Sequence, residues 1–100
     1  MKRASANQPH RIELPEMLDL RAATPLASQL LTQRGEEVIL DASAVQRLGG
    51  QCLQILLSAR ATWELDGTQL RIVDPSPGFV EGLELLGIQP KQLLEEEHAA

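Results

Sequence analysis

Three stretches of the chain arrange their apolar residues as β-strands do. Between residues 11 and 20, apolar side chains alternate at Ile12 and Leu14 and again at Leu18 and Leu20, and Pro15 interrupts the pattern. We therefore expect an edge strand, a bulge or a strand broken in two. Residues 38–40 form a continuous apolar run, which predicts a central strand covered on both faces. Residues 69–74 predict a third strand.

Apolar residues at steps of three and four predict a first helix between the first two strands. Thr24 is a good N-cap and Pro25 suits the first helical position, so we expect the helix to open there. Leu30 and Leu31 belong to its apolar stripe. Gly35 is placed to end the helix.

The last predicted helix shows the same kind of signals. Ser76 followed by Pro77 marks its start, and Gly87 marks its end. Its apolar positions are expected to form the buried face: Phe79, Val80, Leu83 and Leu86.

The middle helix, predicted from about Gly50 to Leu65, is unusually apolar. Its polar residues are spaced by three and four positions and line one narrow stripe: Gln51, Gln54, Ser58 and Thr62. Such a helix is flanked by other elements on several sides or offers part of its surface to a partner. Trp63 is expected to anchor helix packing rather than to act as a binding hot spot.

Strands and helices therefore alternate along the chain, which predicts an α/β fold. We expect a small, mostly parallel sheet with an N-terminal edge strand and helices packed mainly on one side. The domain is expected over residues 11–88. A disordered arm over residues 1–10 would precede it, and an acidic tail over residues 89–100 would follow it.

Composition narrows the classes of function. The net charge of −5 leaves no surplus of Lys and Arg, which argues against nucleic acid as the main partner. No apolar run approaches the roughly 18 residues that span a bilayer, so we expect no direct membrane insertion. The single cysteine allows no internal disulfide, and no apolar leader follows Lys2 and Arg3. These features predict a cytoplasmic protein.

The start of the middle helix holds two candidate chemistries. Gly49 and Gly50 could cradle a phosphate, but no Lys-Ser/Thr pair follows, so a tight loop entering a helix is the favoured interpretation. Cys52 could serve a thiol-dependent enzyme or redox protein, because a helix N-terminus lowers a thiol pKa. A free cysteine beside leucines is more often a small core residue. Two remote histidines and one cysteine give no metal site, and we expect no cofactor.

Asp41 and Ser43 follow the central strand, at the end where α/β folds tend to place their sites. Asp and Ser also build turns. Turn formation and contact with a partner therefore both remain open for these two residues. Phosphorylation of Ser43 is a further hypothesis.

Three segments together resemble the STAS domain, the fold of bacterial anti-sigma-factor antagonists. They read LDLRAATPLASQLL, VILDASAVQRLGGQCLQILLSA and LRIVDPSPGFVEGLELLGI, and the resemblance covers roughly residues 11–88. It implies no enzyme but a protein–protein interaction module in bacterial signal transduction. The alternatives are an anti-sigma-factor antagonist and the cytoplasmic STAS subunit of a lipid transporter.

Regulated STAS domains read D-S-S-G-L at the start of their second helix, and a partner kinase phosphorylates a serine there. On this chain that motif falls on residues 49–53, so Gly50 and Gln51 stand at the serine positions. The resemblance therefore implies a surface without a phosphate switch. The expected partner-binding residues are Asp41, Ser43, Leu48, Gly49, Gly50, Gln51 and Gln54.

The variant R-L-G-G-x-C-L-Q is similar to short STAS domains encoded among the chemotaxis genes of some bacteria. This likeness implies a kinase-like signalling protein or a chemotaxis component as the partner. The chain also lacks one N-terminal strand of the usual STAS pattern. The edge left exposed predicts a homodimer.

Overall fold

The computed structural model describes residues 8–94. Most of the predicted arm and residues 95–100 of the predicted tail lie outside the described residues. The predicted strands and helices follow one another along the described chain in the predicted order, with further short elements among them. Their bounds are β1 His10–Glu13, β2 Met17–Leu18, α1 Leu20–Thr32, β3 Val38–Asp41, β4 Arg47–Leu48, α2 Gly50–Asp66, β5 Leu70–Val73, α3 Pro77–Leu85 and α4 Pro90–Leu93.

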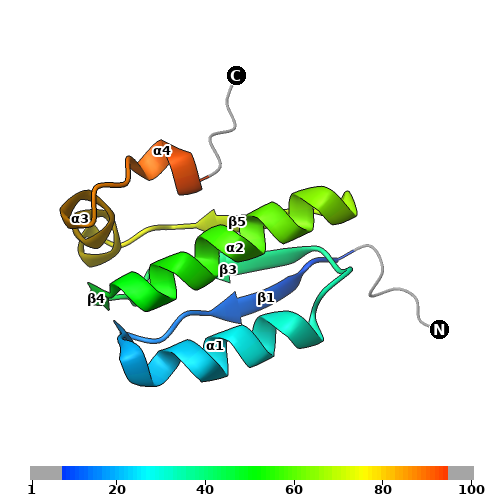
Figure 1. Ribbon diagram of the computed structural model, residues 1–100, viewed down its shortest axis with the longest axis horizontal. Helices are drawn as coiled ribbons and strands as arrows, with labels where there is room; N and C mark the ends of the chain where they lie inside the picture. The colour runs from blue at the N-terminus through cyan, green and yellow to red at the C-terminus, as the bar shows by residue number, and fades with distance from the viewer. Residues whose placement is uncertain (1–7, 95–100) are drawn as a thin grey trace.

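The main sheet consists of three parallel strands in the order β1-β3-β5 (Figure 1). Val38 of β3 is paired with His10 on one side and with Leu70 on the other. The strand β1 therefore lies at an edge of this sheet and β3 at its centre. This arrangement confirms the predicted small parallel sheet with an N-terminal edge strand.

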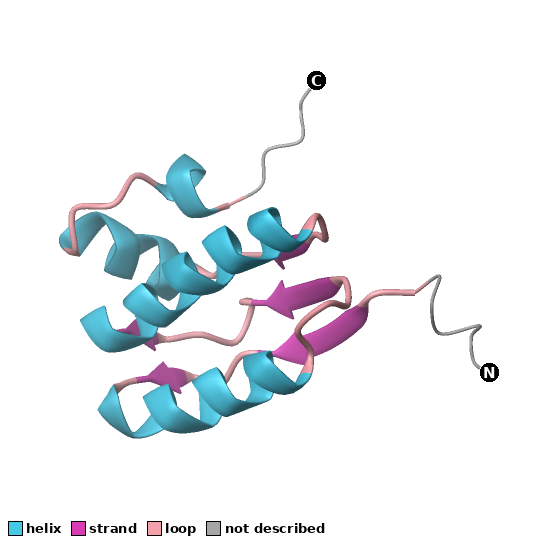
Figure 2. Cartoon of the chain, turned by 45° about the vertical axis from the view of Figure 1, so that its right-hand side comes forward, coloured by secondary structure: helices cyan, strands magenta, loops and turns pink. Residues whose placement is uncertain are grey.

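The helices α1 and α2 lie side by side on one face of the main sheet (Figures 1 and 2). Val38 and Leu40 point to this face and are buried, whereas Ile39 and Asp41 point away from it and are half-buried. The prediction that the central strand is covered on both faces is therefore wrong. The second face stays partly open because the helices are packed mainly on the other side.

Pro15 breaks the first predicted strand in two, which is one of the three outcomes expected for it. Before the proline, the N–H group of Leu14 donates to the carbonyl of Asp41 at 2.9 Å, beside β3. After it, the carbonyl of Glu16 accepts hydrogen bonds from the N–H groups of Gln46 and Arg47. The second piece, β2, therefore pairs with β4 in a separate two-stranded parallel sheet.

The helix α1 begins at Leu20, ahead of the start predicted at Thr24 and Pro25. The carboxylate of Asp19 caps it, because Oδ1 accepts hydrogen bonds from the N–H groups of Arg21 at 3.0 Å and Ala22 at 3.3 Å. Pro25 lies inside the helix, past its first turn, and is exposed, so water can reach the carbonyl of Arg21 to which a residue with an N–H group would donate there.

Some apolar residues that the pattern places in buried stripes are exposed. Leu31 of α1 is 68% exposed, and Leu86, at the C-cap of α3, is 43% exposed. The other signals of α3 are confirmed, since Ser76 caps the helix and Gly87 follows it with a φ of 83°.

The core is aliphatic apart from Phe79 and Trp63, and among the described residues no polar or charged residue is buried in it. Leu93 of α4 is also fully buried, and Arg60 donates hydrogen bonds to the carbonyls of Gln92 and Leu93. The packed structure thus extends beyond residue 88, where the predicted domain ends. None of the described helices is long and apolar enough to span a membrane.

Candidate functional site

The chain enters α2 through two glycines. Gly49 is the N-cap, and its N–H group donates to the carbonyl of Leu18 at 2.8 Å. A Cβ atom on Gly49 would lie 3.3 Å from that same oxygen, so the missing side chain lets β2 approach closely. This geometry confirms the interpretation of Gly49 and Gly50 as a tight entry into a helix.

The first turn of α2 presents neutral polar groups at the surface. Gly49 has no side chain that could cap the helix, and the first helical bond joins the N–H group of Leu53 to the carbonyl of Gly49 at 3.0 Å. Gln51 is exposed, and its amide makes no hydrogen bond with any residue between 8 and 94. Its donor and acceptor are therefore available to another molecule.

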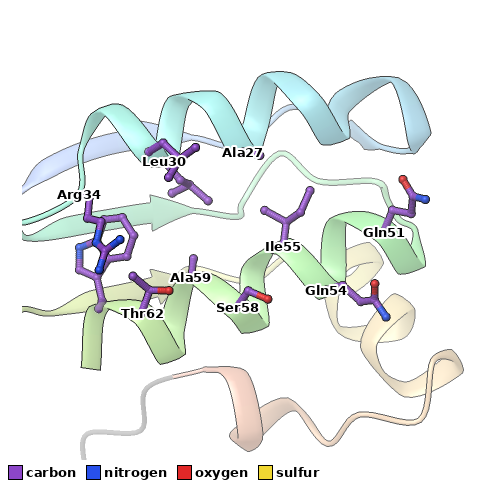
Figure 3. A pocket seen from close by; sticks show the side chains of 11 residues that line it. Ala27, Leu30, Arg34, Gln51, Gln54, Ile55, Ser58, Ala59 and Thr62 are labelled. Atoms are coloured by element: carbon purple, nitrogen blue, oxygen red, sulfur yellow. The ribbon is translucent and has the colours of Figure 1, made fainter. Parts of the chain in front are cut away.

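A groove of about 470 Å³ runs between α1 and α2 (Figure 3). Gln51 lies at one end of it and Arg34 at the other. The α2 wall is the polar stripe that the sequence predicts, together with apolar neighbours. Its lining residues on this helix are Gln51, Gln54, Ile55, Ser58, Ala59, Thr62 and Trp63.

The far end of the groove is closed by an ion pair and an aromatic anchor. Arg34 donates two hydrogen bonds to the carboxylate of Asp66, at 2.9 and 3.2 Å, and these bonds raise the pKa of Arg34 and lower the pKa of Asp66. Trp63 is 3% exposed and its indole donates to the carbonyl of Glu36 at 2.6 Å. Trp63 is thus a packing anchor, as predicted.

A second hollow, of about 580 Å³, lies between β4 and α3 on the other side of the α2 entry. It contains Leu48 and Gly49 of the predicted site. Three exposed apolar side chains that are not among the predicted site residues also line it: Met17, Leu85 and Leu86. The nearest atom to a Cβ built on Gly50 is Cδ2 of Leu86 at 4.0 Å. Apolar side chains therefore border the polar end of α2.

Asp41 and Ser43 line neither the groove nor the second hollow. The carboxylate of Asp41 accepts a hydrogen bond from the N–H group of Ser43 at 2.9 Å and forms an ion pair with Arg11 at 2.8 Å. Hydrogen bonds from the Ser43 side chain and N–H group, and then from Arg11, lower the pKa of Asp41 to about 2. In the described part of the chain, no hydrogen bond or ion pair joins either residue to α2.

Cys52 points into the protein rather than toward the surface. Its side chain is fully buried, and its thiol donates to the carbonyl of Asp19 at 3.3 Å. Burial, and then the charge of Asp19, raise the pKa of this thiol, so it stays protonated at neutral pH. The structure confirms a small core residue and gives no support to thiolate chemistry.

Comparison with known families gives a match over nearly the whole chain. The family model described as "Mlab, STAS domain" matches residues 1–95. The match includes the three segments that resemble this family and extends beyond them on both sides. A comparison with curated proteins gives no match.

Proposed function

The chain belongs to the STAS-domain family, and we propose that it is an adaptor that docks a bacterial signalling protein at the N-terminal end of α2. Membership of the family indicates a non-enzymatic signalling or anti-sigma-antagonist-like module. The observation that carries the docking site is the surface of this helix end. There the unpaired amide of Gln51 stands beside the groove on one side and the hollow with Met17 and Leu85 on the other.

The composition of this surface suits a protein partner. Protein interfaces combine apolar contacts with a rim of polar groups that form hydrogen bonds. Leu85 is 81% exposed and Met17 is 43% exposed, so both can be covered by a partner. Gln51 and Gln54 supply donors and acceptors next to them without the cost of removing a charge from water.

We further propose that docking does not depend on phosphorylation. Gly50 and Gln51 occupy the positions at which regulated members of the family carry serines, and neither has a hydroxyl group. A phosphoserine would add a charge of about −1.5 to −2 at this helix end. Without one, the surface keeps the same charge whether or not a kinase is active.

The likeness of R-L-G-G-x-C-L-Q to short chemotaxis-linked STAS domains supports a chemotaxis or kinase-like component as the partner. An anti-sigma-factor antagonist is the second candidate function, and family membership itself favours it. The two candidates use the same helix end and differ in the partner. Capture of a sigma-regulating kinase would assign the chain to the antagonists.

Gln51→Glu is expected to weaken binding of this partner by about tenfold or more, because docking would remove an unpaired carboxylate from water. The fold should tolerate the change, since a negative charge in the first turn of a helix is mildly stabilising. The partner is captured from the native bacterium with the intact chain and identified. It is then purified and titrated against both proteins.

Gln69→Glu is the matched control. It makes the same charge change at an exposed glutamine beyond the opposite end of α2, and it should leave the affinity unchanged. Equal affinities for the parent chain and Gln51→Glu would place the interface elsewhere. Equal losses in both variants would show that net charge, rather than this helix end, governs binding.

A further inference from the structure

The strand β1 leaves one edge of the main sheet open within the described residues. Its even-numbered residues face β3, since the N–H group of His10 donates to Glu37 and that of Leu14 donates to Asp41. Backbone groups alternate along a strand, so the N–H and C=O groups of Arg11 and Glu13 point to the open edge.

Two prolines limit this edge to a short stretch. Pro9 and Pro15 occupy the next outward positions on either side, and neither has an N–H group. Arg11 and Glu13 are therefore the outward donors between them. Their side chains are exposed, carry opposite charges and lie on the same face of the sheet, whereas Ile12 between them is buried.

We propose that this edge pairs with β1 of a second copy of the chain, antiparallel, about a two-fold axis at Ile12. In that register each Arg11 lies opposite Glu13 of the second copy, and Ile12 lies opposite its counterpart. The paired residues exchange backbone hydrogen bonds, and their side chains form cross-strand ion pairs. The contact is the same on both copies, as a two-fold interface requires.

The charges select the register and favour a second copy as the occupant. A shift of the register that moves the two-fold axis to residue 11 would place Arg11 opposite Arg11 of the second copy and Pro9 opposite its Glu13. A slip to residue 13 would place Glu13 opposite Glu13 and Pro15 opposite Arg11. Both slips bring like charges together and remove a hydrogen-bond donor. The edge is thus complementary to itself in one register.

The contacts already made by Arg11 are compatible with this pairing. Its Nη2 atom lies 2.8 Å from Asp41 and 3.8 Å from Asp74. A guanidinium group has five N–H donors, so others remain for Glu13 of the second copy. Glu13 forms no ion pair within residues 8–94. Since β1 is only four residues long, the interface is small and the dimer should be weak.

Sedimentation equilibrium of the intact chain, from about 10 µM to about 1 mM, tests the proposal. The mass should rise from 11.0 kDa toward twice that value.

Arg11→Glu and Glu13→Arg each place like charges opposite one another and should weaken association by about tenfold. The double variant should recover it, because the two charges exchange places. Position 13 is paired with Asp41 in the register, so an arginine there can contact Asp41 within one chain. Glu13→Arg alone makes the same contact, so recovery of the double variant beyond Glu13→Arg must arise between copies.

Arg71→Glu is the control, because residue 71 lies on the same face and in the same row as Arg11 but on β5. It should leave association unchanged.

Thermal unfolding establishes that each variant folds. If Arg11→Glu does not fold, Glu13→Arg decides alone, because it keeps the contact between Arg11 and Asp41. A monomer at all concentrations, unchanged association of Glu13→Arg, or a folded double variant no better than the single variants would overturn the proposal.

Discussion

Replacing Phe79 by alanine is expected to lower the free energy of unfolding by about 3–5 kcal/mol. Phe79 lies in α3, is fully buried, and is one of two aromatic residues, with Trp63, in a mostly aliphatic core. Its removal takes away buried apolar area and leaves a cavity that neighbouring side chains fill only in part. Domains of this size have about 5–15 kcal/mol of stability in total, so the loss would be a large share of it.

Urea unfolding followed by the fluorescence of Trp63 measures this loss, since Trp63 is the single tryptophan and is buried in the same core. Leu85→Ala is the control on the same helix. Leu85 is 81% exposed, so its replacement should change stability by less than about 0.5 kcal/mol. Similar effects of the two variants would contradict the packing described for α3.

Gly78→Ala is expected to lower the free energy of unfolding by about 1–3 kcal/mol, although alanine is the better helix former by about 1 kcal/mol. A Cβ atom on Gly78 would lie 2.6 Å from the carbonyl oxygen of Gln46 and 2.9 Å from its carbon. These are backbone atoms, and the N–H group of Gln46 is held by the carbonyl of Glu16 at 2.7 Å. The chain would have to shift to make room.

Gly50→Ala is the matched control, because Gly50 also lies in the first turn of a helix. The nearest atom to its added Cβ would be 4.0 Å away, an ordinary contact. The free energy of unfolding of Gly50→Ala should therefore stay unchanged or rise by up to about 1 kcal/mol. If both variants behaved alike in urea unfolding, the close approach of α3 to the segment before β4 would be refuted.

The elements with strong local signals were predictable from the sequence. The strands β3 and β5 follow from short apolar runs, and Ser76 with Pro77 marks the start of α3 through a cap that the structure contains. The polar stripe of α2 also follows from spacing alone, because residues three and four apart share a helix face. The spacing does not show that this stripe lines a groove, because the other wall of the groove is formed by α1.

Other features depend on contacts that local patterns do not encode. The strands β2 and β4 have two residues each, too few for a period to be visible. Asp19 and Thr24 are both good caps, and only the folded chain shows that Asp19 is used. Leu93 belongs to the core because α4 returns to α2 and α3, which its position near the acidic run does not indicate.

The candidate site was predictable in part. Gln51 and Gln54 share the groove, as their spacing suggests, whereas Met17 and Leu85 border the site through contacts between distant segments. Asp41 points away from the face of the sheet that α1 and α2 cover. This could have been inferred, because strand alternation puts the side chains of Leu40 and Asp41 on opposite faces. The turn that joins Asp41 to Ser43 agrees with the turn-building interpretation. A contact of Asp41 and Ser43 with a partner stays a prediction.

The most direct test of the docking surface is an NMR titration of the ¹⁵N-labelled chain with its purified partner. The largest shift changes should fall on residues 49–54 and on the neighbouring Met17 and Leu85. Shift changes confined to the face of the sheet opposite α1 and α2, around Ile39 and Arg71, with residues 49–54 unmoved, would contradict docking at the N-terminal end of α2.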